Sequence, residues 1–350
     1  MKKIAIFTLQ GVVNYGNRLQ NYAVEKIVKD YNYRPESIIL TKYSKLKPLE
    51  VKFINILNRF FGEKSERIES KRKKLFYDFN IQYLQTKYYN VNKLNDIDNK
   101  YEYSITGSDQ VWNPEFDPSG IFLLPFSKKR LCITPSIAIT EIDDAVKKRF
   151  KKELVFFNDI SIREEKGKKM LEQLTGREVV RLIDPTMYVE VDEWKKIEKR
   201  PQKFKENSFI FSYTLGAQDI EKTEIARKIK TEMKCEICSI YDDKKENKII
   251  AGPSEFIWLI HNSKFVITDS FHAVVFAILF HKPFLIYKRK DELKDMSSRY
   301  ETLLDLFEFS NKIYDDCDVN IIDYDFEKSE FILQEERNKM KEYLDRIFMK

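Results

Sequence analysis

Cysteine, glycine and histidine are all scarce in this sequence. Its 350 residues include 4 cysteines, 9 glycines and 3 histidines. Four cysteines in a chain of this length do not make a disulfide framework and are typical of reduced thiols in a cytosolic protein. Cys235 and Cys238 form a C-x-x-C inside an apparent strand, without a second cysteine pair or a nearby histidine, and this disfavours zinc or redox use. We therefore expect no metal site.

Long apolar runs are missing as well. None approaches the length of a membrane span, and the N-terminal "MKKIAIFTLQGV" has too short an apolar part for a signal peptide. We expect a cytoplasmic protein and leave open a place at the inner face of the membrane. The first loop lacks G-x-G-x-x-G, so dinucleotide binding is not supported and no cofactor is expected.

Apolar residues are nevertheless plentiful enough for packed cores. Hydrophobic residues make up 43% and aromatic residues 14% of the chain, which argues against disorder, and the length suits two domains. The 62 basic and 56 acidic residues leave a net charge of +6, which slightly favours anionic small molecules. Because bases and acids are interleaved along the helices and no recognised motif appears, nucleic-acid binding is not expected.

Short strand-like runs alternate with helical patterns along the whole chain, which predicts an α/β fold with parallel sheets. The polar stretch 199–208 is the expected boundary between two Rossmann-like domains, residues 1–199 and 200–350. The last amphipathic helix, from residue 329 to the C-terminus, is a candidate to pack across both domains. Four segments are expected to return as strands to the first sheet: "YEYSIT", "RLCITP", "DISIR" and "VVRLI".

In open α/β sheets, ligands bind outside the carboxyl ends of the strands. One such corner is 268–272, where a strand turns into an apolar helix. Asp269 or Ser270 is expected to cap that helix, and free N–H groups at its start attract anions. His272, in the first turn, is a candidate proton donor or cation there. The alternative is a histidine that caps the helix or is buried and hydrogen-bonded.

Two further corners carry polar residues after strands. Arg163 is placed to grip a carboxylate or phosphate, and the alternative is a surface arginine paired with a neighbouring glutamate. Ser108 and Asp109 are natural helix caps, but Asp109 is also a candidate general base and Ser108 a candidate to bind the acceptor. Trp112 is a candidate to stack on a sugar ring or, equally, a buried core residue.

The first loop, before the helix that begins near residue 17, contains neutral hydrogen-bonding groups. We expect these groups to line an acceptor site. They are Asn14, Tyr15, Gly16 and Asn17. The Asp184–Pro185 pair after a later strand is expected to fix a turn.

Together these corners resemble the polysaccharide pyruvyl transferase family. The resemblance runs from about the first strand to about Phe307 and depends on six segments in a fixed order. They are "NYGNRLQNYA", "TGSDQVWNP", "ISIREEKG", "LIDPT", "GPSEFIWLIHNSKFVITDSFHAVVFAILFHKPF" and "SSRYETLLDLF".

The resemblance implies a GT-B-like arrangement with an inter-domain cleft, the first domain on the acceptor side and the second on the donor side. It also implies transfer of a pyruvate ketal group from phosphoenolpyruvate, as co-substrate, to two hydroxyls of a sugar. The acceptor would be a cell-surface polysaccharide or its lipid-linked precursor. The family's histidine and arginine that contact the donor match His272 and Arg163, and Ser270 and Phe271 complete that corner.

One departure concerns the donor's charge. Many family members have Arg-Leu-His where this chain has Ser-Phe-His, so a trianionic donor would need a cation from elsewhere. The candidates are Arg299, Lys166 and Arg289.

Two other functions stay open. A glycosyltransferase with a nucleotide-sugar donor would use the same architecture and the same anion-attracting corner. A non-catalytic partner in polysaccharide assembly would use the basic amphipathic region 53–76 for peripheral contact with an anionic membrane, unless its apolar side packs on the first domain. A homo-oligomer also stays open.

Overall fold

The chain was analysed as a computed structural model. It describes residues 1–11, 13–41, 64–215, 223–240, 249–287, 297–314 and 321–349, with residues 64–67 and 297–299 described for their backbone alone. Residues 53–63 of the basic amphipathic region 53–76, and Arg289, therefore lie outside the described residues.

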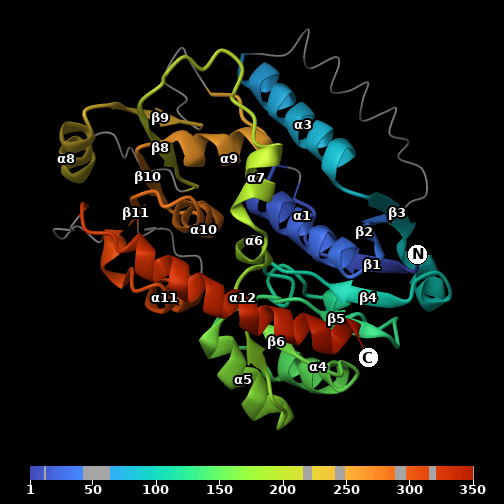
Figure 1. Cartoon of the computed structure of the whole chain (residues 1–350). Helices are drawn as coiled ribbons and strands as arrows, with labels where there is room; N and C mark the ends of the chain where they lie inside the picture. The colour runs from blue at the N-terminus through green and yellow to red at the C-terminus, as the bar shows by residue number, and fades with distance from the viewer. Residues whose placement is uncertain are drawn as a thin grey trace. The chain divides into compact units, whose positions relative to one another are not determined.

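Unit 1 is built on a parallel five-stranded sheet (Figure 1). Along the sheet the strands follow the order β3-β2-β1-β4-β5, which is that of the first five strands of the Rossmann fold. β1 is central, with Ile6 opposite Ser37 of β2 on one side and Ile105 of β4 on the other. The bounds are β1 Lys3–Phe7, β2 Arg34–Thr41, β3 Thr86–Asn90, β4 Tyr103–Thr106 and β5 Arg130–Cys132.

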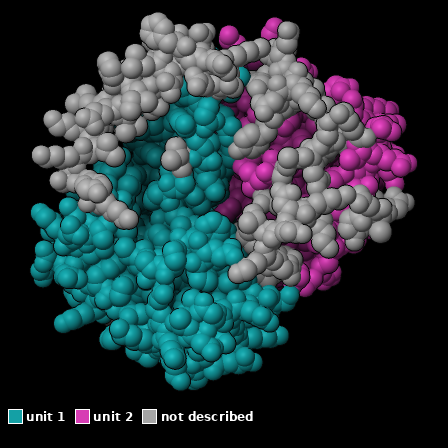
Figure 2. All heavy atoms as spheres, turned by 180° about the vertical axis from the view of Figure 1, so that it is seen from behind, with its two compact units in different colours: residues 1–189, 294–299, 336–350 teal, residues 190–293, 300–335 magenta. Residues whose placement is uncertain are grey.

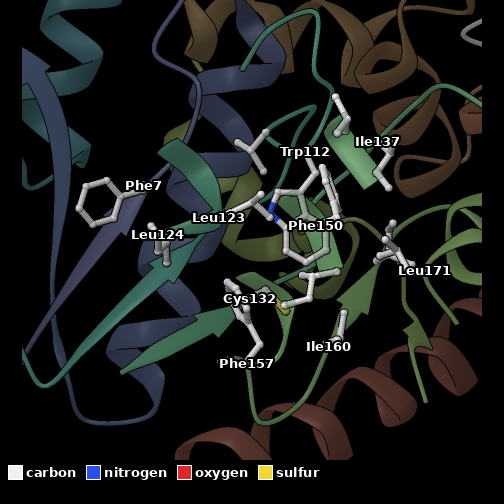
Figure 3. Packing of buried hydrophobic residues seen from close by; sticks show 14 of the residues in the cluster. Phe7, Trp112, Leu123, Leu124, Cys132, Ile137, Phe150, Phe157, Ile160 and Leu171 are labelled. Atoms are coloured by element: carbon white, nitrogen blue, oxygen red, sulfur yellow. The ribbon is translucent and has the colours of Figure 1, made fainter. Parts of the chain in front are cut away.

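The helices of unit 1 bury apolar side chains against this sheet. A dense part of the core surrounds Trp112, whose ring meets those of Phe150 and Phe157 edge-on, at centroid distances of 6.1 and 5.9 Å (Figure 3). The bounds are α1 Tyr15–Asp30, α3 Lys64–Tyr83, α4 Asp144–Leu154, α5 Glu165–Thr175 and α6 Pro185–Tyr188, with 3-10 helices η1 Val91–Asn99 and η2 Ile121–Leu123.

Two of the four strands expected to return to the first sheet do not join it. β6 (Ser161–Ile162) and β7 (Val180–Arg181) form a separate two-stranded parallel sheet. The Ser161 side chain explains the separation. Its hydroxyl donates to the Cys132 carbonyl at 3.2 Å and accepts from the Thr134 amide at 3.1 Å, so side-chain bonds take the place of ladder bonds beside β5.

Unit 2 is built on a second parallel five-stranded sheet with the order β12-β11-β10-β8-β9. By chain position this is 5-4-3-1-2, the flavodoxin-like doubly wound order. The α/β class with two parallel sheets is therefore confirmed. The bounds are β8 Phe209–Tyr213, β9 Glu236–Ser239, β10 Phe265–Thr268, β11 Phe284–Tyr287 and β12 Ile313–Tyr314, with α7 Val191–Ile197, α8 Glu224–Met233, α9 Pro253–Asn262, α10 Phe271–Leu279, α11 Ser297–Leu306 and η4 Ser310–Lys312.

The chain divides into two compact units, which Figure 2 colours separately. Unit 1 comprises residues 1–189, 294–299 and 336–350, and unit 2 comprises residues 190–293 and 300–335. The domain boundary expected at residue 199, the cleft between the domains and the acceptor and donor sides stay predictions.

The C-terminal helix α12 (Phe326–Phe348) contributes its last part, from residue 336, to unit 1. Glu336 is 1% exposed and receives a two-pronged bond from Arg181, at 2.5 and 3.0 Å. Tyr343 is also buried, and its hydroxyl donates to the Cys132 carbonyl at 2.8 Å. In the part of the chain that the structure describes, no helix is both long and apolar enough to span a bilayer.

Glu25 ties α1 to two strands of the first sheet. Its side chain is fully buried and accepts from the Ser37 hydroxyl at 2.7 Å and from the Gln85 amide at 2.9 and 3.0 Å. Burial raises the pKa of this carboxyl, although the bonds from Ser37 and Gln85 and the charge of Lys29 act in the opposite direction.

This raised pKa predicts the pH dependence of stability. The folded state holds the Glu25 proton more tightly than the unfolded chain does, so the stabilisation is present below the unfolded pKa and is lost as the pH rises through the folded one. Relative to Glu25→Gln, which stays neutral, the wild type should lose unfolding free energy as the pH rises above about 4. Urea unfolding from pH 4 to 8 measures the difference. Glu178→Gln, on the exposed surface, should show a flat difference. A wild type that gains stability over Glu25→Gln with rising pH would contradict the prediction.

Candidate functional site

The switch point of the first sheet lies between β1 and β4, because the chain leaves these neighbouring strands in opposite directions. The backbone beyond the two strands is joined there. The Thr8 hydroxyl donates to the Ser108 carbonyl at 3.0 Å, and the Gly107 amide donates to the Phe7 carbonyl at 2.8 Å. Residues 108–109 are thereby fixed beside the start of α1.

Helix α1 begins earlier than the sequence predicted, so Asn14 to Asn17 form a helix cap and first turn rather than a loop. The Asn14 side chain accepts from the Asn17 amide at 3.0 Å, which satisfies an early N–H of the helix. Asn17 is 4% exposed; its side-chain amide donates to the Asp109 carboxylate, and its side-chain oxygen accepts from the Gly11 amide at 3.1 Å. Tyr15 is 1% exposed and packs on Phe76.

Asp109 occupies a left-handed backbone conformation, with φ of 75°. Aspartate tolerates this region better than most residues. The residue therefore does not cap a helix, contrary to one of the two expectations. Its carbonyl accepts from the Ser136 amide at 2.8 Å, and its carboxylate accepts from Asn17 and, at 2.9 Å, from the Gln110 amide. At 5% exposure, Asp109 is an almost fully buried acid at the switch point.

A buried ion pair lies at the carboxyl ends of the next two strands. Arg163 follows β6, is 4% exposed and donates to the Asp184 carboxylate after β7. Ser108 also reaches Asp184, at 3.3 Å, and Glu164 accepts from the Ser136 hydroxyl. The alternative of a surface arginine is therefore wrong as to the surface, although Arg163 also pairs with the neighbouring Glu164 at 3.7 Å.

The carboxylates around Arg163 determine its protonation. Burial by itself lowers the pKa of the guanidinium, but the charges of Asp184, Glu164 and Asp109 outweigh burial and raise that pKa above its ordinary value. Arg163 is therefore a permanent cation, and its orientation is fixed by Asp184.

Asp184 begins a short helix instead of fixing a turn. It is the N-cap of α6, and its carboxylate accepts from the amide and the hydroxyl of Thr186 at 2.9 and 2.7 Å. Its role beside Arg163 was missed by the sequence analysis, although its position directly after a strand was a usable signal.

Trp112 and Lys166 differ in burial. Trp112 is 2% exposed, and its indole donates to the Phe122 carbonyl at 3.4 Å, so the core alternative of the sequence analysis describes it. Lys166 lies in the first turn of α5 with an exposed side chain.

The corner 268–272 of unit 2 also lies at a switch point, between β8 and β10. The Thr268 hydroxyl donates to the Tyr213 carbonyl at 2.5 Å. The Asp269 carboxylate accepts from the Leu215 amide at 2.7 Å, and its carbonyl accepts from the Tyr300 hydroxyl at 2.5 Å. Asp269 thus joins the corner to the segment after β8 and to α11, two contacts that the sequence did not predict.

Helix α10 begins at Phe271 with Ser270 in the N-cap position, but the expected side-chain cap is absent. The Asp269 carboxylate accepts from the Leu215 amide, and Ser270 forms no capping bond through its hydroxyl. His272 is 6% exposed, with its ring 5.3 Å from that of Phe271 in an edge-on arrangement. The imidazole therefore lies almost wholly inside the protein, in the first turn of the helix.

The two other histidines make separate contacts in unit 2. His261 pairs with Glu198 at 2.8 Å and His281 with Glu330 at 3.2 Å.

Each unit thus gathers its own set of predicted residues. Unit 1 brings together Asn17, Ser108, Asp109 and Arg163, and unit 2 brings together Ser270, Phe271 and His272. Arg299 belongs to α11, and its side chain lies outside the described residues.

One cavity lies at the other end of the first sheet, beside the amino ends of β1 and β2. Its volume is about 610 Å³, and its walls include Lys2, Tyr31, Tyr33 and Asp345. None of the predicted site residues lines it. Within the described ranges, no three His, Cys, Asp or Glu side chains are placed to hold a metal ion.

Comparison with known proteins gives one family match. A family model described as polysaccharide pyruvyl transferase matches residues 14–291. No curated protein sequence matches the chain.

Three solved structures are similar to the chain. UDP-GlcNAc 2-epimerase from Neisseria meningitidis, bound to UDP-GlcNAc, is 11% identical over 99% of this chain and 94% of its own, with a TM-score of 0.48. The Methanocaldococcus jannaschii UDP-GlcNAc 2-epimerase is 10% identical over 95% and 98%, with a TM-score of 0.43. HepE from Anabaena, in complex with UDP and glucose, is 9% identical over 100% and 98%, with a TM-score of 0.42.

The buried pair in unit 1 gives a stability prediction. Asp184→Ala leaves the Arg163 guanidinium buried beside fewer carboxylates, so it should lower the free energy of unfolding by about 3–5 kcal/mol. Guanidinium unfolding measures the loss. The matched control is Asp192→Ala, which removes the acid of an exposed pair with Lys195 and should lose less than about 1 kcal/mol. Equal losses in the two variants would count against a structural role of the buried pair.

Proposed function

The chain belongs to the polysaccharide pyruvyl transferase family and is therefore a transferase, and from that premise we propose its reaction. It transfers a pyruvate ketal group from phosphoenolpyruvate to two hydroxyls of one sugar, in a cell-surface polysaccharide or its lipid-linked precursor. The observation that carries the proposal is the pair of switch points within the matched region. One has an imidazole at a helix start, and the other has a carboxylate bonded to a side chain in the first turn of a helix.

The reaction balances with inorganic phosphate as the second product. A proton adds to the methylene carbon of phosphoenolpyruvate, which becomes the methyl group, and C2 becomes electrophilic. One sugar hydroxyl forms a bond to C2 and gives up its proton. The C2–O bond to phosphate then breaks, and a second hydroxyl closes the ketal and gives up its proton. Of the two hydroxyl protons, one replaces the proton donated to the carbon and one leaves on phosphate.

His272 is the general acid of the proposal. An imidazole exchanges protons near neutral pH, and its place in the first turn of α10 puts it at a helix N-terminus, which attracts anions such as phosphate. Low exposure of the site keeps water away from the electrophilic carbon.

Arg163 is the proposed partner of the donor carboxylate. A guanidinium binds a carboxylate through two parallel bonds, and Asp184 fixes the orientation of this one. Lys166 and Arg299 are proposed to supply the further positive charge that a trianionic donor needs.

Asp109 is the proposed base that accepts a proton from an acceptor hydroxyl. The amide bond from Asn17 orients its carboxylate, and the exposed Asn14 offers a neutral hydrogen-bonding group to the sugar. The rings of Tyr15 and Trp112 pack on other aromatic rings in the core, so we propose no acceptor contact for them. Gly16 and Ser108 adjoin Asn17 and Asp109 in the chain and stay proposed acceptor contacts.

We place the reaction in the cytoplasm. Cys132, Cys235 and Cys238 are free thiols, which suits a reducing compartment. Contact of the protein with a membrane surface stays a prediction about residues 53–76.

The proposal is tested by supplying phosphoenolpyruvate and candidate sugar acceptors to the purified chain. Mass spectrometry should show a ketal on the sugar, with one phosphate released for each ketal formed. His272→Ala should lower this rate by about a hundredfold or more, because it removes the proton donor. His281→Ala, which removes an exposed histidine paired with Glu330, is the matched control and should keep the wild-type rate.

Two results would count against parts of the proposal. A wild-type chain that transfers no pyruvyl group to any sugar tested, while binding a nucleotide sugar, would replace the reaction with glycosyl transfer. A His272→Ala variant with near-normal turnover would remove this residue from the role of acid and leave the reaction itself intact.

A further inference from the structure

Arg18 is a buried arginine in α1, one turn after the helix cap. It is 5% exposed, and its guanidinium reaches back to the segment that follows β1. Nη1 donates to the side-chain oxygen of Gln10 at 2.7 Å, and Nη2 donates to the Gly11 carbonyl at 2.7 Å. Both partners are neutral groups.

The other buried arginines named so far have carboxylate partners. Arg163 is paired with Asp184, and Arg130, with 6% exposure, is paired with Glu153 at 2.8 Å. Arg18 makes no such pair with any residue of the described ranges. Burial accordingly lowers the pKa of its guanidinium to about 10, although the charge of Tyr88 acts in the opposite direction. Arg18 thus keeps a positive charge out of water without a carboxylate partner among the described residues.

Two buried hydrogen-bond donors of Arg18 and Gln10 also lack an acceptor among the described residues. They are Nε of Arg18 and the side-chain nitrogen of Gln10. Buried donors are almost always satisfied, so two such donors on side chains that contact one another require an explanation. A group with two oxygens and a negative charge would satisfy both donors and the charge together.

The segment beside Arg18 is shaped for a close approach to the helix start. A side chain at Gly11 would put its Cβ 2.6 Å from the side-chain oxygen of Asn17, so a larger residue there would displace the Asn17 side chain that accepts from the Gly11 amide. Asn17 in turn bonds Asp109. One segment therefore connects the buried guanidinium with the proposed base.

We propose that Arg18 and Gln10 bind an oxyanion, a carboxylate or phosphate group of a substrate, at the carboxyl end of β1. Arg18 supplies the charge and its Nε–H, and Gln10 supplies its amide N–H. The identification of the oxyanion as part of a substrate rests on the proposed function, whereas binding itself does not. Its source is either the donor or an anionic sugar of the acceptor, and both present the same chemistry.

The test measures anion binding by the whole chain, through the rise of the thermal unfolding midpoint with ligand concentration. Three probes separate the sources: phosphoenolpyruvate for the donor, and glucuronate and glucose 1-phosphate for an anionic acceptor sugar. The variants are Arg18→Met, Arg18→Lys and Gln10→Leu. Arg34→Met is the matched control. Arg34 is the first residue of β2, and its side chain is 56% exposed.

At least one probe should bind the wild type and Arg34→Met equally, and bind Arg18→Met at least about tenfold more weakly. Arg18→Lys should retain part of the affinity, because it keeps the charge and loses the planar fork. Gln10→Leu should weaken the same probe and leave the charge in place. If Arg18→Met does not fold, Arg18→Lys and Gln10→Leu carry the test.

The pattern of probes decides the source and the fate of the proposal. If the affinity for phosphoenolpyruvate falls in the Arg18 variants, the site binds the donor. If the affinity for glucuronate or glucose 1-phosphate falls, the site binds the acceptor. Equal affinity of every probe for the wild type and the variants, or no binding of any probe to the wild type, overturns the proposal. Because binding is read without turnover, a chain that binds through Arg18 but makes no ketal contradicts the proposed function alone.

Discussion

The ion pair between Arg163 and Asp184 is the interaction on which the carboxyl edge of unit 1 depends. It joins the residues after β6 and β7, and through Ser108 it reaches the segment after β4. Because both side chains are almost fully buried, each needs the other: a lone charge at that depth would be strongly destabilising. The ion pair that stabilises this edge also fixes the orientation of the Arg163 guanidinium. Stability and the proposed donor contact therefore depend on the same interaction.

The two units differ in the hydrogen bonds formed at the switch points of their sheets. At the switch point of the first sheet, polar side chains bond one another across strand ends, with the Asn17 amide on the Asp109 carboxylate. At the switch point of the second sheet, the bonds run mainly from side chains to the backbone, from Thr268 to Tyr213 and between Asp269 and Leu215. The first arrangement concentrates charge, and the second leaves an imidazole as the polar group at the start of a helix. This division suits a reaction that needs a base and a cation as well as a proton donor.

Several local expectations were wrong because side chains took up bonds that the sequence pattern assigned to the backbone or to caps. Ser161 occupies hydrogen-bonding groups beside β5, so β6 and β7 form their own small sheet. Asp269 bonds Leu215 and does not cap α10, and Asp109 adopts a left-handed turn without starting a helix. Propensity describes what a residue does with its neighbours in the chain, whereas each of these bonds joins segments far apart in sequence.

The sequence by itself determined the alternation of strands and helices, the two parallel sheets, the family and the corners where polar residues follow strands. These follow from periodicity and from short segments, which are local properties of the chain. Only the tertiary structure decided which polar residues are buried and what satisfies them: that Arg163 has Asp184, that Trp112 belongs to the core, and that Arg18 has no carboxylate partner among the described residues. Burial and pairing depend on contacts between distant segments, and a single sequence does not record those contacts.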